Sequence, residues 1–458
     1  MIRAFRQFIR WEHRHRLIPH IVVFCILTFL ALKFTLRGAS SNDLLYYYGV
    51  LVTFVILLTF TLSFTLYRDP YEEALEKLAR RKRKPKNPLV TCLVAVYNEE
   101  AVIEKCVTSV VNQTYKNKEI IFINDCSTDG TLKILRRLKK RYGITVIDCK
   151  KNVGKKGALA RGVYEAKGTI FAFSDSDSIW APDAVEKIVK IFRADEHVGA
   201  VSGHTRALNS DKNLLTKVQD SWYEGQYSIR KAFESIFNSV SCVSGPLAVF
   251  RKEAIYNYMP AWEQDTFLGS PFRFATDRTL TGFVLGSKQL EKKLKAKYKD
   301  SPFMAKNYPA RNWKVVYCKS ARAWTNVPES PRAVIKQQVR WKKSFIRNTF
   351  FTGAFFWRKP FPVAFVYYLH VAFVFLGPFV AFRHLIYLPL YGNLASMVLY
   401  LSGICFVGLM FGLAYKLENP DSHRWVYRPL MSLFSTLVLS WLIFYSIATV
   451  KKMVWSRG

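Results

Sequence analysis

The chain has 458 residues, enough for one catalytic domain together with several membrane segments. Its net charge of +35 indicates anionic partners, such as nucleic acid, anionic lipid or phosphorylated substrates. Because much of the basic charge lies beside apolar segments and the sequence contains no nucleic-acid-reading motif, we expect membrane lipids and no nucleic acid among the partners. The 8 cysteines form no CxxC pair, which excludes a regular disulfide framework and favours buried thiols in a reducing compartment.

Two apolar runs begin the chain, at residues 17–36 and 44–67. Each is long enough to cross about 30 Å of hydrocarbon at about 1.5 Å per residue. Arginines before the first run and the sequence RRKRKPK after the second place both outer ends of this hairpin in the cytoplasm, by the positive-inside rule. We therefore predict a basic segment and transmembrane hairpin over residues 1–70 and a cytoplasmic domain over residues 88–330.

Inside that domain, apolar runs alternate with segments of helical spacing. Residues 89–96, 120–123, 144–147 and 169–173 are typical of parallel strands buried on both faces, and residues 102–111 have the spacing of a helix. The polar residues that follow these strands are Tyr97, Glu99, Asp125, Asp175 and Asp177. Because ligands bind at the carboxyl edge of an open parallel sheet, we expect these side chains to meet at one site.

Asp175 and Asp177 lie two residues apart in FSDSDS, directly after a predicted strand. Carboxylate oxygens suit Mg²⁺ or Mn²⁺, and such a metal could bridge the phosphates of a nucleotide; an acidic turn that caps the next helix is the alternative. Asp125 is suited to accept hydrogen bonds from a base or ribose, or to form an Asx turn. Lys155 and Lys156 in NVGKKG could reach a phosphate, or lie on a solvated face.

Two later segments combine residues suited to transfer chemistry. After the loop CVSGPLAVFRKE, the sequence FATDRTL places Asp277 beside Arg278. A carboxylate near a sugar pocket is a suitable general base for a hydroxyl, whereas a surface ion pair is the alternative. In QQVRW, Arg340 and Trp341 suit a diphosphate and a base or sugar ring, although an Arg-Trp pair can also be an interfacial anchor.

In this order, VAVYNEE, INDCSTDGT, GKKGALARG, SDSD, the SGP loop, TDR and QQVRW resemble the processive membrane glycosyltransferases of family 2. Hyaluronan synthases are the most similar group, with chitin and cellulose synthases beyond them. The resemblance implies an α/β GT-A domain with a Rossmann-like, mostly parallel sheet, flanked by transmembrane helices. It also implies an inverting hexosyltransferase of the cell membrane, with its catalytic domain in the cytoplasm. Such an enzyme uses a UDP-sugar and Mg²⁺ or Mn²⁺ to extend a nascent β-linked polysaccharide, and it couples synthesis to translocation.

The resemblance also implies roles for individual residues. Asp277 would be the catalytic base with Arg278 beside it, and Asp175 and Asp177 would bind the metal. The nucleotide-sugar would contact Tyr97, Glu99, Asp125, Lys156, Asp175, Asp177, Gln337, Arg340 and Trp341. The acceptor would lie against Ser244, Gly245, Pro246 and Trp341. In the terminal VWSRG, which looks like a shortened gating loop, Trp455 and Arg457 would have the gating role. Two departures from the family pattern are Thr276, where an acidic residue is usual, and an additional basic stretch over residues 288–311.

The C-terminal part poses a question of topology. Residues 331–360, which contain QQVRW, are predicted to form interfacial amphipathic helices, and residues 361–458 a transmembrane region with apolar stretches at 362–385, 394–415 and 429–450. Three crossings would put the tail opposite the catalytic domain, whereas Lys451 and Lys452 favour the same side. Either the last stretch is partly interfacial or re-entrant, which we favour, or the tail is a basic membrane anchor.

Two other functions are compatible with parts of the sequence. One is a non-processive transferase that acts on a lipid phosphate, and QQVRW argues against it. The other is a catalytically silent membrane scaffold or export channel, and the intact set of Asp175, Asp177, Asp277 and Arg340 argues against it. The choice among GlcNAc, glucose and glucuronate as donor depends on pocket shape, which no motif in the sequence specifies.

Overall fold

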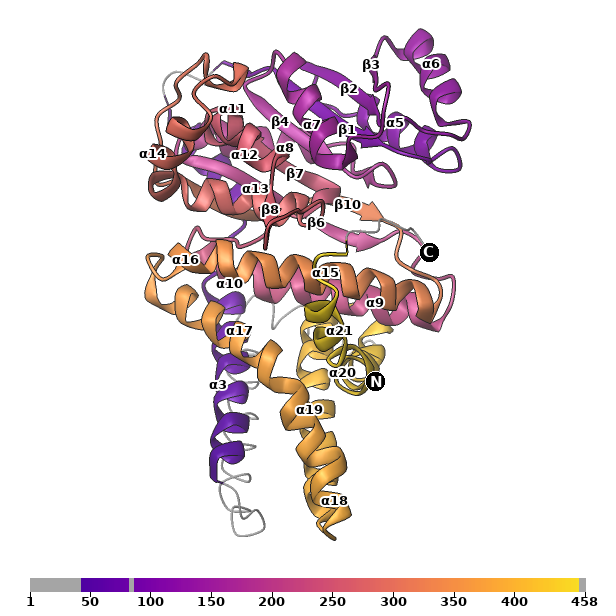
Figure 1. The fold of residues 1–458 in the computed structure, drawn as a ribbon, viewed down its shortest axis with the longest axis vertical. Helices are drawn as coiled ribbons and strands as arrows, with labels where there is room; N and C mark the ends of the chain where they lie inside the picture. The colour runs from indigo at the N-terminus through magenta and orange to yellow at the C-terminus, as the bar shows by residue number, and fades with distance from the viewer. Residues whose placement is uncertain (1–42, 82–85, 453–458) are drawn as a thin grey trace.

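The computed structural model describes residues 43–81 and 86–452, and two parts follow one another along its long axis (Figure 1). An α/β domain forms one part, and helices that run along the long axis form the other. Between them lies a layer of helices that run across the axis, here called the transverse layer. Its members are α9 (Leu214–Gly225), α10 (Ala232–Ile236), α15 (Pro331–Phe351) and α16 (Gly353–Phe356). The predicted membrane segment at residues 17–36 lies outside the described residues.

An 8-stranded sheet with the strand order β3-β2-β1-β4-β7-β6-β10-β5 forms the centre of the α/β domain. Strands β3, β2, β1 and β4 are parallel, as are β6 and β10, whereas β7 and β5 run antiparallel to their neighbours. The strands are β1 (Val90–Val96), β2 (Lys118–Asn124), β3 (Thr145–Asp148), β4 (Ile170–Ser174), β5 (Ile179–Trp180), β6 (Val198–Ala207), β7 (Ala248–Arg251) and β10 (Lys314–Thr325), with a separate hairpin of β8 (Thr266–Phe267) and β9 (Ser270–Pro271). The predicted mostly parallel sheet is confirmed, and the four predicted strands correspond to β1 to β4.

Strand β1 is buried along its whole length because helices cover both faces of the sheet. Leu93 packs in the same core as Leu159 of α7, whereas Val94 packs with Ile103 of α5 on the opposite face. The helices of this domain are α4 (Pro70–Ala79), α5 (Ile103–Val111), α6 (Thr131–Tyr142), α7 (Gly154–Glu165), α8 (Ala184–Ala194), α11 (Lys252–Ile255), α12 (Met259–Glu263), α13 (Thr276–Leu285) and α14 (Ser287–Lys297). Short 3-10 turns are η3 (Gly245–Leu247), η4 (Tyr256–Tyr258) and η5 (Pro302–Met304).

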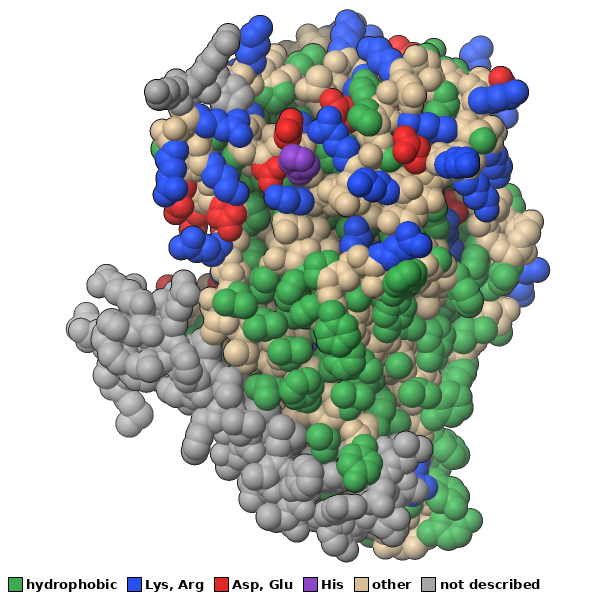
Figure 2. All heavy atoms as spheres, turned by 90° about the vertical axis from the view of Figure 1, so that its left-hand side faces the viewer, with side chains coloured by type: hydrophobic (Ala, Val, Ile, Leu, Met, Phe, Trp, Pro, Cys, Tyr) green, Lys and Arg blue, Asp and Glu red, His purple; other side chains and the backbone are tan. Residues whose placement is uncertain are grey.

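Three helices among the described residues are long and apolar enough to cross a membrane: Tyr47–Ala79, Phe361–Leu390 and Leu394–Glu418. They contain α3 (Asp43–Thr65), α17 (Phe361–Phe382) with η6 (Arg383–Tyr387) and α18 (Leu388–Leu390), and α19 (Leu394–Glu418). Figure 2 shows hydrophobic side chains over this part of the surface and Lys and Arg side chains over the α/β domain. These helices agree with the predicted apolar stretches at 44–67, 362–385 and 394–415.

The last predicted stretch, residues 429–450, is not one straight helix. It consists of η7 (Arg424–Tyr427), α20 (Arg428–Phe434), the π-helical η8 (Ser435–Leu439) and α21 (Leu442–Ala448), with a bend of 44° before α21. At its beginning, Arg424 Nη1 donates to Asp220 Oδ2 of α9 at 2.8 Å, and at its end Lys343 of α15 donates to the carbonyl of Lys452 at 2.8 Å. Both ends therefore lie against the transverse layer. The bent pair of helices suits a broken span or a re-entrant loop, and residues 424–452 are called the re-entrant segment below, after the alternative favoured from the sequence.

Helix α19 packs closely on α20 because α19 presents glycines there. A Cβ atom at Gly408 would lie 2.6 Å from the Cα atom of Pro429, and one at Gly412 would lie 2.7 Å from the carbonyl oxygen of Trp425. Gly403, on the same helix, has nothing within 4 Å of its Cβ position. Gly408 and Gly412 therefore lie on the face of α19 that packs against the following helices, and Gly403 lies where the described residues leave space.

We expect Gly408→Ala to destabilise the protein by about 1–3 kcal/mol, because the methyl group overpacks the contact between α19 and α20. Gly403→Ala is the matched control and should leave the melting temperature unchanged or slightly higher. Thermal unfolding of the two variants in the same detergent measures the difference. Equal melting temperatures for both variants would contradict the close packing described here.

Candidate active site

A single cavity of about 1950 Å³ extends from the carboxyl edge of the sheet, through the transverse layer, to the apolar helices. At the sheet edge it is lined by Asp125, Asp175, Asp177 and Asp277, and in the transverse layer by Gln337, Arg340 and Trp341. Farther along it is lined by Phe373, Val374, Gly377 and Pro378 of α17 and by Leu439, Leu442 and Tyr445. The structure therefore brings most of the predicted site residues to one continuous space.

Asp125 follows β2 and is buried at the sheet edge. Its Oδ1 accepts a hydrogen bond from the backbone N–H of Val153 at 2.7 Å, and its carbonyl accepts one from Asn152 Nδ2 at 3.1 Å. Burial raises the pKa of Asp125, and the hydrogen bonds from the backbone of Val153 and Gly154 oppose that change in part. The loop between β3 and α7 thus fixes this carboxylate in the cavity wall.

Asp175 and Asp177 follow β4, and side chains from other elements hold each of them. Lys155, in the first turn of α7, forms an ion pair with Asp175. Thr325, the last residue of β10, donates to Asp177 Oδ1 at 3.2 Å. Burial, together with the negative charge of Asp175, raises the pKa of Asp177 to about 6. Two carboxylates are therefore kept close at the price of mutual repulsion, which an additional cation would relieve.

The SGP loop comes so close to Asp175 that any side chain at position 245 would displace its carboxylate. A Cβ atom at Gly245 would lie 2.8 Å from Asp175 Oδ2. The backbone N–H of Gly245 also donates to Asp277 Oδ2 at 3.3 Å, and the Cys242 thiol donates to the same oxygen at 3.6 Å. This loop therefore joins the carboxylates after β4 to the TDR motif. Ser244 and Pro246 line the cavity beside it.

Asp277 lies in the first turn of α13. The chain reaches it through Ala275, whose φ of 58° is in the left-handed region that non-glycine residues adopt infrequently. Asp277 Oδ1 accepts from the backbone N–H of Arg278 at 2.8 Å. Trp262 Nε1 donates to the carbonyl of Thr276 at 2.8 Å, so the turn is held from outside the cavity as well.

Helix α15 carries the QQVRW motif into the same cavity. The Trp341 ring lies 5.8 Å from the Trp222 ring of α9 and 6.4 Å from the Tyr223 ring, centroid to centroid. Burial lowers the pKa of Arg340, and the charge of Asp175 opposes this. Helix α15 therefore places Arg340 near Asp175 and Trp341 against the aromatic residues of α9, and Gln337 lines the same cavity.

Tyr97 and Glu99, after β1, have different environments. Tyr97 is 41% exposed and lines the cavity, so its ring is accessible to a ligand. Glu99 is buried, and its Oε1 accepts a hydrogen bond from Ser176 Oγ at 3.0 Å. Because Ser176 lies between Asp175 and Asp177 in the sequence, Glu99 braces the turn that carries both aspartates.

Lys156 does not line the cavity; its neighbour Lys155 does. Lys156 Nζ pairs with Asp265 Oδ2 at 2.7 Å and donates to the carbonyl of Phe272 at 2.9 Å. Asp265 also pairs with Arg347 of α15, and burial lowers the pKa of Lys156 to about 8. Adjacent residues on a helix point about 100° apart, which is why one of the two lysines faces the cavity and the other an internal ion pair.

Several cavity residues were not predicted from the sequence. The segment formed by α9, the π-helical η2 (Gln226–Lys231) and α10 contributes Trp222, Tyr223, Gln226, Tyr227, Arg230, Lys231 and Glu234. The aromatic and charged residues of SWYEGQYSIRKAFE are a signal that could have identified it. Lys231 donates to Ser202 Oγ at 2.9 Å and to the Cys242 carbonyl at 2.7 Å, so it supports the SGP loop. The predicted gating residues Trp455 and Arg457 lie outside the described residues.

The site offers two carboxylates, Asp175 and Asp177, as ligands for a divalent cation. Within residues 43–81 and 86–452 there is no group of three or more His, Cys, Asp or Glu side chains that could hold a metal ion. Asp175 and Asp177 offer hard oxygen ligands that repel one another, and a metal held by them would need further oxygen ligands from phosphates or water. This donor set suits Mg²⁺ or Mn²⁺ bound together with a nucleotide diphosphate.

Comparisons with known proteins agree with this geometry. Residues 91–259 match the model of the glycosyl transferase family 2. The hyaluronan synthase of Streptococcus pyogenes is 28% identical over 441 residues, which cover 94% of each chain. An N-acetylglucosaminyltransferase of Rhizobium leguminosarum bv. viciae is 28% identical over 268 residues, 57% of each chain. A solved mannosyltransferase of Pyrobaculum calidifontis, in complex with GDP-Man and Mn²⁺, has a TM-score of 0.51 at 18% identity and covers 89% of this chain and 98% of its own.

The mostly parallel sheet, with carboxylates at the ends of its strands, and the similarity to a solved mannosyltransferase define a GT-A glycosyltransferase fold. Residues 91–259 therefore form a glycosyl transferase family 2 domain, and the similarity of the whole chain to hyaluronan synthases supports a hexosyltransferase. The fold, family and enzyme class predicted from the sequence are therefore confirmed.

Asp177→Asn should stabilise the ligand-free protein at pH 7.5 by about 1–3 kcal/mol and abolish metal-dependent binding of UDP. The pKa of Asp177 is about 6 in the folded protein, above the ordinary value of an aspartate. Its charge therefore disfavours folding at neutral pH. This penalty begins to decrease as the pH falls below about 6, where the folded protein takes up the proton, and it is lost only below the ordinary pKa of an aspartate, about 4.

Melting temperatures of the wild type and of Asp177→Asn at pH 7.5 and pH 5 test this sign, and the difference should shrink at pH 5. Calorimetry with UDP and Mn²⁺ tests the binding. Asp300→Asn, at an exposed residue, is the control for loss of one negative charge. A variant that melts like the wild type at pH 7.5 would contradict the account.

Proposed function

We propose that this protein is a membrane-embedded, inverting and processive glycosyltransferase. It transfers sugar from a UDP-sugar to a growing β-linked polysaccharide and passes the product into the membrane through the cavity described above. The observation that carries the proposal is the continuity of that cavity, from the carboxylates at the sheet edge to the apolar residues of α17 and of the re-entrant segment. A transferase that released its product after one step would have no use for this path.

The roles proposed for individual residues follow from their positions. Asp125 is suited to the uracil and ribose, and Tyr97 and Arg340 line the space between it and the transverse layer. Asp277 is the proposed general base: it removes the proton of the acceptor hydroxyl while that oxygen attacks the anomeric carbon from the face opposite the diphosphate. One displacement of this kind inverts the configuration. Arg278 is half-buried beside the base, lines the same cavity, and balances its charge.

The diphosphate leaving group needs positive charge as it departs. Lys155, paired with Asp175, and Arg340 supply cations from two sides of the cavity. Asp175 and Asp177 would hold Mg²⁺ or Mn²⁺, which when bound supplies additional positive charge for the diphosphate. In this proposal Lys155 takes the place near the phosphates that the sequence suggested for Lys156.

The acceptor sugar is proposed to lie between the SGP loop and the aromatic residues of the transverse layer. Ser244, Gly245 and Pro246 border Asp277, and Trp341 presents a flat ring to the same space. We also propose that the α/β domain lies in the cytoplasm. The basic run beginning at Arg80, directly after the apolar helix, supports this orientation by the positive-inside rule. The described end of the chain at Lys452 then lies on the cytoplasmic side.

Asp277→Asn should lower the rate of sugar transfer at least about 100-fold while leaving UDP binding intact, because it removes the base and keeps the shape of the side chain. The measurement is metal-dependent UDP release from purified enzyme, with UDP affinity measured on the same sample. Normal turnover by this variant would show that Asp277 is not the base.

Incubation of the purified protein with UDP-sugars, singly and in pairs, should yield long polymer in the presence of Mg²⁺ or Mn²⁺. One productive donor indicates a homopolymer, and a required pair indicates an alternating polymer. Mass analysis of the product separates processive synthesis from transfer of a single sugar. Removal of the divalent cation with a chelator should stop the reaction, and single-sugar products from every donor would contradict the proposal.

A further inference from the structure

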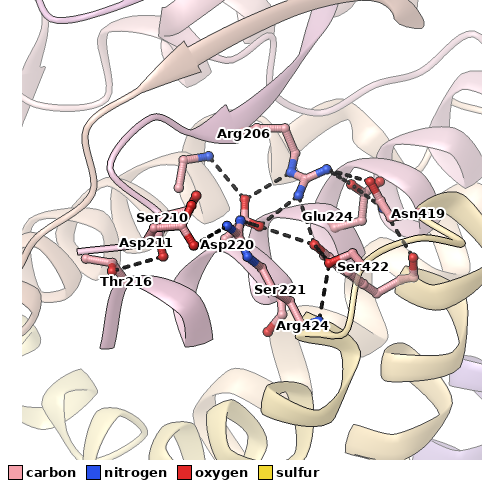
Figure 3. A network of polar contacts seen from close by, with 12 residues as sticks. Arg206, Ser210, Asp211, Thr216, Asp220, Ser221, Glu224, Asn419, Ser422 and Arg424 are labelled. Carbon is pink, nitrogen blue, oxygen red and sulfur yellow. Dashed lines mark hydrogen bonds and ion pairs between the residues drawn. The ribbon is translucent and has the colours of Figure 1, made fainter. Parts of the chain in front are cut away.

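Helix α9 carries two sets of side chains that matter for the cavity. Trp222 and Tyr223 line the cavity and contact Trp341 of α15. Asp220 and Glu224 lie one turn apart, are 0% and 2% exposed, and take part in a network of polar contacts (Figure 3). At about 100° per residue, Trp222 lies roughly half a turn away from Asp220 around the helix axis, whereas Tyr223 lies about 60° from it. Because all four side chains belong to one helix, the contacts of the buried carboxylates determine how the aromatic residues face the cavity.

Arg206, near the end of β6, connects both carboxylates to the sheet (Figure 3). Its Nε and Nη2 atoms donate to the two oxygens of Asp220 at 3.0 and 2.7 Å, which is a bidentate pair. Its Nη1 atom donates to Glu224 Oε2 at 2.9 Å. Burial alone would raise the pKa of Asp220, but the charges and hydrogen bonds of Arg206 and Arg424 hold it below its ordinary value. The pair therefore stays ionised.

Residues that follow the membrane-spanning part of α19 complete the same network. Asn419, directly after α19, accepts from Arg206 Nη1 at 2.8 Å and donates to Glu224 Oε2 at 3.2 Å. The hydroxyl of Tyr415 accepts from Arg206 Nη2 at 3.0 Å. Arg424, at the beginning of the re-entrant segment, donates to Asp220 Oδ2 at 2.8 Å. The apolar helices thus reach the same two carboxylates of α9 as the sheet does.

We propose that this network is a positioning device for the polysaccharide: it sets the rotation of α9 and ties that rotation to α19, so that Trp222 and Tyr223 stay aligned against Trp341. Rotation of α9 would leave buried carboxylates unpaired, which is unfavourable, so the helix has one preferred setting. Flat aromatic surfaces suit the apolar faces of sugar rings. This inference rests on the proposed function, because it assumes that a polymer occupies the cavity.

The consequence is a specific defect. When the contacts from α19 and Arg424 are lost, Asp220 still pairs with Arg206, so α9 remains folded but is held from one side only. The aromatic surface is then less well aligned, and the polymer should leave the enzyme earlier. The donor site should be unaffected, because Asp125, Asp175 and Asp177 follow strands β2 and β4 and do not contact α9 through this network.

The chain provides a matched control for simple anchoring of α19. Lys319 of β10 forms an ion pair with Glu418, the residue before Asn419. This pair fastens the same end of the same helix to the same sheet, but it does not involve α9. Loss of the Lys319–Glu418 pair therefore tests attachment without the positioning of α9.

The experiment compares the length of the polymer made by Asn419→Leu, Arg424→Met and Lys319→Met with that of the unmodified enzyme. We expect several-fold shorter polymer from the first two variants, with KM for the UDP-sugars within about two-fold of the unmodified value, because donor binding is unchanged. Lys319→Met should give polymer of unmodified length. UDP affinity and gel filtration of each variant establish that it is folded.

Equal shortening in Lys319→Met, or unmodified length in all three variants, would overturn the proposal. If Asn419→Leu and Arg424→Met do not fold, Tyr415→Phe decides the question. It removes only a hydroxyl, which contacts Arg206, Asp220 and Ser422. Shorter polymer supports the proposal and unmodified length contradicts it. Failure of the proposed function itself would be evident separately, because the unmodified enzyme would then make no polymer.

Discussion

Buried carboxylates that require cationic partners hold the α/β domain on the helices beneath it. A buried ion pair cannot lose one partner without leaving an isolated charge in a poorly solvated place. Asp265, close to the loop that precedes α13, is shared by Lys156 of α7 and Arg347 of α15. Asp220 of α9 is shared by Arg206 of β6 and Arg424. These two carboxylates fasten the α/β domain to two different helices of the transverse layer.

The same constraint explains the character of the candidate site. Two carboxylates that face the cavity lie close to the same lysine: Lys155 pairs with Asp175 and also lowers the pKa of Asp177, which nevertheless stays raised and whose Oδ1 accepts from Thr325. The internal carboxylates, by contrast, are each matched by two cationic side chains. The internal carboxylates therefore maintain the fold, whereas those that face the cavity are available to a ligand. Titratable groups with perturbed pKa values are typical of functional sites.

The sequence predicted the sheet edge well because local patterns define it. Continuous apolar runs gave β1 to β4, and the polar residues that follow them reach the edge wherever a parallel sheet forms. The roles of Asp277 and of the SGP loop came from the family resemblance, not from spacing, and the hydrogen bond between them was not predicted. Three features required coordinates. They are the choice between Lys155 and Lys156, the contribution of α9 to the cavity, and the position of the 44° bend in the last apolar stretch. Each depends on the rotation or direction of a helix, which composition and periodicity do not specify.

The end of the re-entrant segment has a consequence for the chemistry at the sheet edge. Val450 belongs to the same hydrophobic cluster as Phe272, Phe274 and Ala275, the residues that lead into the turn of Asp277. Phe267 of the hairpin packs on this cluster and also lies 5.7 Å from the Phe350 ring of α15. Residues of the last apolar segment, of the β8–β9 hairpin and of α15 therefore pack against the loop that precedes Asp277. A change in the sequence of the last apolar segment would therefore have to keep the apolar contact of Val450 with Phe272, Phe274 and Ala275, because this contact helps to hold the turn that carries Asp277, the proposed base.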